Sequence, residues 1–350
     1  MLHESSPVSL KRTLPWEAVA SLVDKDQALW NPDVELEASA LRALPTGEIV
    51  VPDTGPLGLT PWSRRQLAGL LGIRWDKWFE KVSGEETAQE INRRLSRTDA
   101  AWKLRTRQLR PGEYFANGAL AAIVSPTYTP IADERIIGSL TQAVGERWLS
   151  SLRVFHAEFT DRSTHLGIIS PSPATIHAGD RRDEFFTGVY VRNSQVGFTA
   201  LTVHVYFLRL VCSNGMLATD GEFRLLYRTH RPIENDALDG LMERAFASLK
   251  LRWQDGLAAL ESALGVAVEN AEEAVHGLLK QVPGFGRYQE PVLTALKQEG
   301  LFATRFGLVQ AMAEVARLLP HPDQRFEMER LAGRLLFASG PQAEPQQVSA

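Results

Sequence analysis

The residues best suited to catalysis are histidines and carboxylates near the middle of the chain. His156 and Glu158 share one face of a predicted strand, His165 lies on the next strand, and Asp180 follows in a loop. Imidazole and carboxylate groups bind transition metals when several of them meet. One hypothesis is therefore a metal-dependent enzyme that acts on nucleic acid or on a nucleotide. Because none of the chain's eight histidines has a diagnostic spacing, an ordinary structural role is the alternative.

A second set of residues suits the binding of a flexible polyanion. Cationic side chains contact phosphates, and aromatic rings stack on unpaired bases at about 1–3 kcal/mol for each base. Three cations alternate along one predicted strand and share a face of it, and three further residues lie on or beside a predicted hairpin. The pattern predicts a groove for single-stranded DNA, with an ordinary solvated sheet face as the alternative. In chain order, the set is Lys103, Arg105, Arg107, Arg192, His204 and Tyr206.

A third hypothesis is a helix-turn-helix regulator that binds duplex DNA. Ala68, Gly72 and Trp78 have the spacing of a small residue, a turn glycine and an apolar residue in that motif. Arg74 and Lys77 would then face outward from the second helix. The pattern is short, so a helical hairpin packed on the sheet is the simpler interpretation.

The sequence lacks the signatures of several common enzyme classes. It has no G-x-x-x-x-G-K-[ST] loop for nucleoside triphosphates, no G-x-G-x-x-G loop, no H-E-x-x-H and no G-x-S-x-G. We therefore expect a protein that is not an enzyme and needs no cofactor.

Composition and charge predict a soluble intracellular protein. The 350 residues are 44% hydrophobic and 23% charged, with a formal net charge of -4. Cys212 is the only cysteine, and we find neither a signal peptide nor an apolar run of about 18 residues, so we expect a cytoplasmic protein. Residues 64–110 hold 12 Lys and Arg against 6 Asp and Glu, whereas residues 233–300 hold 6 against 11. This asymmetry predicts a homo-oligomer whose acidic helices contact basic ones.

Periodicity predicts an α+β protein in which a central antiparallel sheet is flanked by N-terminal and C-terminal helices. The segments 102–109, 114–124, 152–160, 164–170, 184–194, 198–212 and 223–227 alternate like strands, and 133–148 is typical of a helix. The predicted regions are an extended proline-containing arm (1–58), a helical region (59–100), an antiparallel β core with one helix (101–232), a C-terminal helical region (233–338) and a disordered tail (339–350).

Several motifs resemble those of a widespread phage/plasmid-like protein family that is classed as a domain of unknown function. They are Val191-Arg192-Asn193-Ser194-x-Val-Gly197, the run from Phe207 to Met216, the step from Ser125 to Asp133, and two C-terminal segments, 304–309 and 329–333. The resemblance covers roughly residues 59–336, and the proline-to-aspartate step is one residue longer here than is usual.

The resemblance implies a setting on a mobile element, where proteins for DNA recombination or repair are common. A compact sheet with flanking helices is also similar in outline to the single-strand annealing proteins, which form rings. Our leading hypothesis is therefore a non-enzymatic, oligomeric protein that binds and anneals single-stranded DNA. The metal-dependent enzyme and the helix-turn-helix regulator remain the alternatives.

Overall fold

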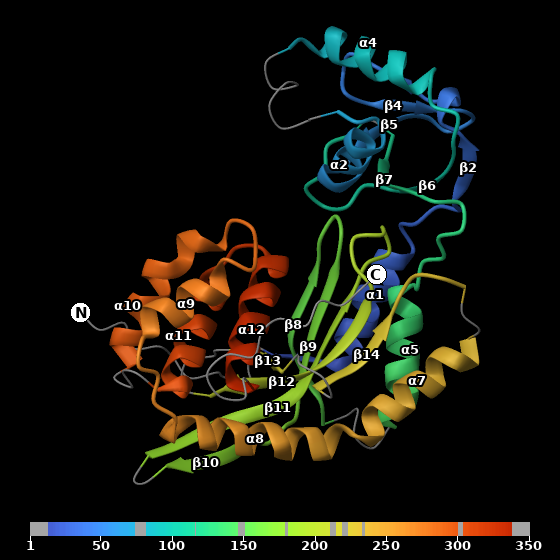
Figure 1. Cartoon of the computed structure of the whole chain (residues 1–350). Helices are drawn as coiled ribbons and strands as arrows, with labels where there is room; N and C mark the ends of the chain where they lie inside the picture. Colours follow the sequence, from blue (N-terminus) through green and yellow to red (C-terminus); the bar gives the residue numbers. More distant parts are fainter. Residues whose placement is uncertain are drawn as a thin grey trace.

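The computed structural model describes residues 13–73, 82–115, 117–145, 151–178, 181–210, 215–218, 223–232, 235–299 and 304–337. The predicted tail, residues 339–350, lies outside these ranges. The mixed α+β class is confirmed, but the strands form two sheets rather than one (Figure 1). The smaller sheet and its helices form the upper part of the molecule in Figure 1, above the larger sheet.

The larger sheet has eight strands, and every pairing between them is antiparallel. The main path runs β1-β8-β9-β11-β12-β13, while β10 pairs with β11 and β14 with β12. Five of these strands match predicted segments, whereas β1, β10 and β13 do not. The bounds are β1 Leu14–Pro15, β8 Arg153–Phe159, β9 Thr164–Ile169, β10 Ala174–Ala178, β11 Arg181–Asn193, β12 Leu201–Arg209, β13 Gly215–Ala218 and β14 Arg224–Arg228.

Strands β11 and β12 form the predicted hairpin, with Tyr190 opposite His204. Alternation along β12 divides its side chains between two faces. Val203 and Val205 belong to the main hydrophobic core, while Tyr206 belongs to a separate cluster that contains Phe326 of a C-terminal helix. Both faces of the hairpin are therefore covered.

The smaller sheet has the order β2-β6-β7-β5-β4-β3 and contains one parallel pair, β5 with β7. Its bounds are β2 Val34–Glu37, β3 Arg42–Ala43, β4 Ile49–Val51, β5 Gly55–Leu59, β6 Ala101–Arg107 and β7 Ala119–Val124. Helices α2 (Pro61–Leu70) and α4 (Gly84–Leu95) pack on it around a core of their own. Thr60 caps α2 with its side chain, and Pro61 occupies the first turn of this helix.

The expectation of an extended arm is wrong for the described part of residues 1–58. Helix α1 (Trp16–Gln27), the short 3-10 helix η2 (Ala38–Ala40) and strands β1 to β5 lie there. The prolines fit these elements, because Pro15 is the residue before α1 and Pro56 lies in β5. Trp16 is buried and donates from its indole nitrogen to the Thr141 hydroxyl 3.3 Å away, so α1 is anchored in the fold.

Most of the remaining helices lie around the larger sheet. Helix α5 and the C-terminal helical region confirm the predicted helices, and α8 passes under the sheet in Figure 1. Among the described residues, no helix is long and apolar enough to cross a bilayer. The bounds are α5 Asp133–Val144, α7 Asn235–Ala247, α8 Leu249–Gly265, α9 Ala271–Leu279, η4 Phe285–Tyr288, α10 Gln289–Glu299, α11 Arg305–Leu318 and α12 Pro322–Phe337.

Helix α12 packs closely on the larger sheet beside β13. A Cβ atom added to Gly333 would lie 1.6 Å from the carbonyl oxygen of Leu217, so the helix can approach this closely only with glycine there. Because α12 packs so closely, it covers the polar side of β11 and β12. That side is therefore buried and is not a solvated sheet face.

The turn after β11 joins the two sheets. Asn193 donates from its side-chain amide to the Asp133 carboxylate at 2.6 Å, and the Tyr128 hydroxyl donates to the Ser194 carbonyl at 2.9 Å. From helix α2, which packs on the smaller sheet, the Trp62 indole donates to the Val196 carbonyl at 2.9 Å. Two of the motifs on which the family resemblance depends, around Asp133 and Asn193, therefore meet in one buried junction.

Candidate functional site

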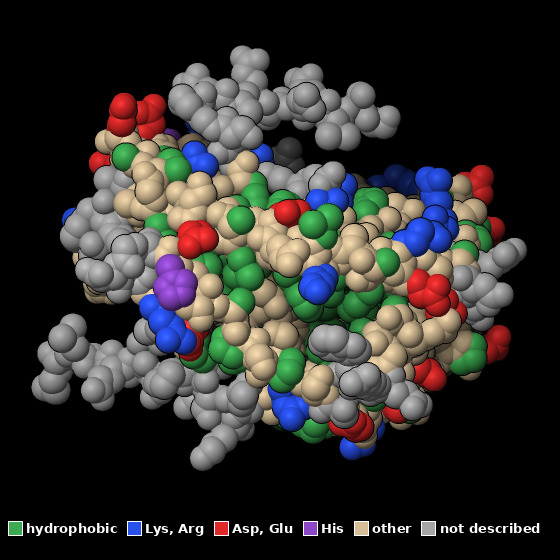
Figure 2. All heavy atoms as spheres, turned by 90° about the horizontal axis from the view of Figure 1, so that it is seen from below, with side chains coloured by type: hydrophobic (Ala, Val, Ile, Leu, Met, Phe, Trp, Pro, Cys, Tyr) green, Lys and Arg blue, Asp and Glu red, His purple; other side chains and the backbone are tan. Residues whose placement is uncertain are grey.

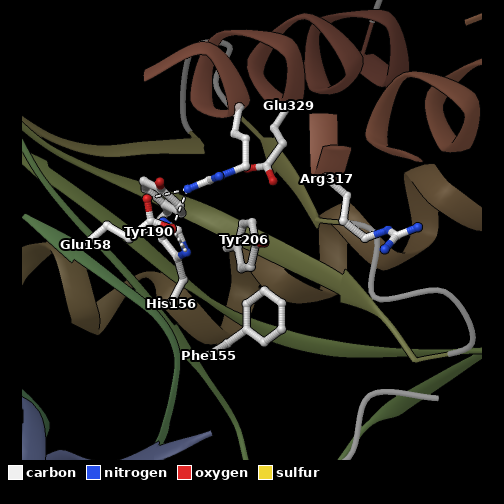
Figure 3. A pocket seen from close by; sticks show the side chains of 8 residues that line it. Phe155, His156, Glu158, Tyr190, Tyr206, Arg317 and Glu329 are labelled. Atoms are coloured by element: carbon white, nitrogen blue, oxygen red, sulfur yellow. Dashed lines mark hydrogen bonds and ion pairs between the residues drawn. The ribbon is translucent and has the colours of Figure 1, made fainter. Parts of the chain in front are cut away.

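Helix α12 covers a cavity of about 220 Å³ on the larger sheet. Strands β8, β11 and β12 form its floor, and α11 and α12 form its other walls (Figure 3). Its lining combines three aromatic rings with five ionisable side chains. The lining residues are Phe155, His156, Glu158, Tyr190, Tyr206, Arg317, Arg325 and Glu329.

An ion pair closes one side of this cavity. The Arg325 guanidinium hydrogen-bonds both oxygens of the Glu158 carboxylate and also donates to the Leu319 carbonyl at 2.9 Å. The Nδ1 atom of His156 lies 3.3 Å from the same carboxylate. Arg325 is therefore already paired with an anion and is not available to bind an anionic ligand.

His156 is a neutral imidazole at physiological pH. Burial, followed by the charge of Arg325, lowers its pKa to about 3. Its Nε2 atom is buried without a hydrogen-bond partner. With Nδ1 toward Glu158 as the protonated nitrogen, Nε2 is a hydrogen-bond acceptor.

Glu329 is the second unusual group of the cavity. Burial raises its pKa to about 8, and Arg325 opposes this only in part. The side chain is therefore a carboxylic acid at neutral pH, and its Oε2 atom has no hydrogen-bond partner. A protonated carboxyl can donate one hydrogen bond and accept another.

A hydrogen-bonded chain runs behind the cavity from Asp323 through His165 to Tyr190. The Nε2 atom of His165 lies 3.2 Å from the Asp323 carboxylate, and Nδ1 lies 2.9 Å from the Tyr190 hydroxyl. Burial alone would raise the pKa of Asp323, but the hydrogen bond to His165 and the charge of Arg192 hold it well below its usual range. Burial also raises the pKa of Tyr190 well above 10, so the phenol stays protonated and serves as a wall rather than a nucleophile.

The residues of the metal hypothesis are brought together only in part. Glu158 and His165 are opposite each other on β8 and β9, and His156 is two residues along β8. In the part of the chain that the structure describes, no three His, Cys, Asp or Glu side chains are arranged to hold a metal ion. Asp180 lies outside the described residues. We therefore propose no metal site from this set.

The predicted groove on β6 is wrong, because its cations are enclosed and paired. Arg107 is 1% exposed and pairs with Glu113 at 2.5 Å, and Arg105 pairs with Asp33 at 3.0 Å. Lys103 lies 3.2 Å from Glu35. Alternation correctly predicts the strand but cannot show that acidic residues elsewhere in the smaller sheet and its loops neutralise these side chains.

The residues that we placed on the hairpin face are buried as well. Arg192 pairs with Asp323 at 2.7 Å, and His204 and Tyr206 are 4% and 2% exposed. Burial lowers the pKa of His204 to about 3, so it carries no charge for a phosphate. Helix α12 supplies both the cover and the carboxylates, so Arg192 and His204 are not open to a phosphate backbone in the described conformation.

The helix-turn-helix hypothesis rests mainly on residues outside the described ranges, namely Arg74, Lys77 and Trp78. Cys212 also lies outside them. In the described part, Ala68 is buried and Gly72 has the left-handed φ of 62° that a turn glycine permits. Helix α2 packs on the smaller sheet.

A second cavity, of about 260 Å³, lies between β14, α7 and α8. We call it the arginine cavity, because Arg224, Arg244 and Arg252 line it together with Ser248 and apolar side chains. No acidic residue is among the described residues of its lining, but Arg252 pairs with Asp255 just outside it at 3.3 Å. The Arg224 guanidinium lies 5.0 Å from the centre of the Tyr227 ring, which is 56% exposed.

Sequence reasoning missed the arginine cavity because its arginines lie far apart in a region that is acidic overall. A weak signal was present, since Arg224 and Tyr227 lie three residues apart on a predicted edge strand. The face seen from below in Figure 2 mixes acidic, basic and hydrophobic side chains, and no broad field of one charge covers it. Any anion site on such a surface must be local.

No protein-family model, no curated protein and no solved structure matches this chain. The resemblance to the phage/plasmid-like family therefore stays a prediction from its motifs.

Proposed function

We propose that this protein binds single-stranded nucleic acid through the arginine cavity and performs no bond chemistry there. The observation that carries the proposal is the convergence of three guanidinium groups, of which Arg252 also pairs with Asp255, on one cavity whose described lining holds no carboxylate. Arginine suits phosphate because its planar fork can donate two parallel hydrogen bonds.

The exposed ring of Tyr227 supports a strand with unpaired bases rather than a duplex. A base can stack on an exposed ring, and an arginine beside the ring can hold the adjoining phosphate. On β14 the Arg224 guanidinium lies over the Tyr227 ring, so a base would stack on the other face of this ring. Arg244 and Arg252 lie across the cavity on α7 and α8, within reach of the same backbone.

We also propose that the protein is a cytoplasmic homo-oligomer, for which a ring is one arrangement. Its role would be to anneal strands during recombination or repair. The support for association is the contrast between the acidic segment 233–300 and the basic segment 64–110. Measuring the molecular mass in solution with and without a thymidine oligonucleotide tests this part. A monomer under both conditions would remove it and leave binding as a separate question.

The binding itself is tested by fluorescence anisotropy with a labelled thymidine oligonucleotide at low salt. We expect the double variant R224A/R244A to bind at least about tenfold more weakly than the wild type. The matched control is R287A, because Arg287 also lies over a tyrosine, Tyr288, at 4.8 Å but outside the cavity. Equal losses in both variants, or no binding by the wild type, would refute the proposed interface.

A further inference from the structure

The cavity under α12 contains two buried polar atoms that have no hydrogen-bond partner. They are His156 Nε2 and Glu329 Oε2, which lie on β8 and α12 respectively. Leaving a buried polar atom unpaired costs about 1–3 kcal/mol, so such atoms commonly mark a place where a ligand or an ordered water completes the bonding. Figure 3 shows both side chains near the rings of Tyr190 and Tyr206.

The chemistry of these two atoms restricts what can fill the cavity. Neutral His156 accepts a hydrogen bond, whereas the protonated Glu329 carboxyl can both donate and accept. A ligand that satisfies both side chains must donate a hydrogen bond from an N–H group to His156. Next to this group it must present a donor and an acceptor to Glu329. An anionic ligand fits poorly, because both arginines of the lining are already paired, Arg325 with Glu158 and Arg317 with Glu314.

The walls restrict the shape of the ligand. Phe155, Tyr190 and Tyr206 offer aromatic surfaces, which favour a flat ring between or against them. The volume of about 220 Å³ is below the 300–1,000 Å³ that is typical of pockets for drug-sized molecules. One small ring system suits this space better than a complete nucleotide.

We infer that the cavity under α12 binds a single nucleobase, with the base edge on Glu329 and His156 and the ring against the aromatic walls. The base could be a free nucleobase or one base of a bound strand, and only the second source rests on the proposed function. Both sources present the same edge chemistry, so the experiment separates them.

Glu329 gives this inference a pH dependence that can be measured. The charged and titratable groups around it are Arg325 on α12, Arg317 on α11, Tyr190 on β11, Tyr206 on β12, and His156 and Glu158 on β8. Strand β13 contributes no titratable side chain. The pKa of His156 is about 3 and those of Tyr190 and Tyr206 lie well above 10, so these three groups keep their protonation between pH 7 and 9.

The test is isothermal titration of the full-length protein with adenine and with cytosine, at pH 7 and at pH 9, with benzoate as a flat anionic control. We expect both bases to bind at pH 7 and benzoate not to bind. Affinity for the bases should fall about tenfold at pH 9, because Glu329 then loses its donor proton. The variant E329Q keeps a neutral donor and acceptor, so it should bind at both pH values.

A further variant, E329L, keeps the side chain buried without polar atoms and should lose base binding at both pH values. Circular dichroism confirms that each variant is folded. The inference is overturned if neither base binds to folded wild-type protein, if benzoate binds instead, or if E329L binds as well as the wild type.

The two proposals fail separately. If R224A/R244A loses the oligonucleotide but still binds free adenine, both proposals stand. If the wild type binds adenine but no oligonucleotide, the nucleobase cavity stands and the proposed function falls. If the wild type binds the oligonucleotide but no free base, the cavity inference falls alone.

Discussion

The guanidinium of Arg192 lies 2.7 Å from the carboxylate of Asp323, although the two residues are 131 positions apart in the chain. Arg162 and Ser163 bind the same carboxylate, at 2.6 and 3.1 Å. A residue that the sequence suggested for DNA binding is thus part of the contact that fastens α12 to the larger sheet. Its role in the described conformation is structural.

The first prediction concerns this contact. The substitution D323N should lower the free energy of unfolding by about 3 kcal/mol, since it leaves buried Arg192 with only the more distant Glu327 carboxylate, 3.6 Å away, as a counter-ion. Urea denaturation measures the change. The matched control is E184Q at the exposed pair with Arg182, where we expect less than about 1 kcal/mol. A D323N protein as stable as the wild type would show that the buried pair does not hold the helix.

A second prediction concerns stability at acid pH. The pKa of His204 is about 3 in the folded protein, so the unfolded chain takes up a proton near pH 6.5 that the folded chain does not. This contribution to stability is complete above pH 6.5 and is lost as the pH falls toward 3. The loss should be about 1.4 kcal/mol for each pH unit. The variant H204Q should flatten the pH profile of unfolding by that amount, and an unchanged slope would mean that His204 is accessible to protons in the fold.

Glu329 leads to a third prediction, with the opposite sign. Its pKa is about 8 in the folded protein against 4.5 in the unfolded chain, so the fold binds a proton that the unfolded chain releases between these values. Stability from this group is complete below pH 4.5 and is lost as the pH rises toward 8. The substitution E329Q removes the titration and should stabilise the protein by about 3 kcal/mol at pH 7 and by little at pH 4. Thermal unfolding at both pH values checks it, and a destabilised E329Q at pH 7 would contradict the buried acid.

Two glycines in helices provide a fourth prediction. Substituting Gly333 by alanine should destabilise the protein by several kcal/mol, because the new Cβ would meet the Leu217 carbonyl oxygen. The same change at Gly277 of α9 meets nothing within 4 Å and should stabilise it by up to about 1 kcal/mol through helix propensity. Urea midpoints of the two variants decide the matter. Equal effects would mean that α12 can move away from β13 without cost.

Local patterns predicted most of the regular elements of this fold. Alternation identified β8, β9, β11 and β12, and the spacing of Ile136, Ile137 and Leu140 identified α5. Strands of two to five residues, such as β3 and β4, are too short for a periodic signal, so the first 58 residues were read as irregular. Whether a polar sheet face meets water depends on distant segments, and no local pattern contains that information.

From the sequence, only those residues of the candidate site that neighbouring strands bring together could be predicted. His156, Glu158 and His165 were recognised because neighbouring strands bring them together. Asp323, Arg325 and Glu329 were missed, since they lie on a helix more than 150 positions later. One usable signal was the presence of several carboxylates on a helix whose other positions are largely apolar, because such carboxylates need cationic partners when the helix is buried.

The central claim, that the arginine cavity holds the phosphates of a single strand, is tested most directly by the salt dependence of binding. The logarithm of the association constant should fall linearly with the logarithm of the salt concentration, by about 0.7 for each phosphate contact. For R224A/R244A the slope should be shallower by about 1.4, while R287A should keep the slope of the wild type. Identical slopes for the wild type and the double variant, or no measurable binding at the lowest salt, would contradict the account.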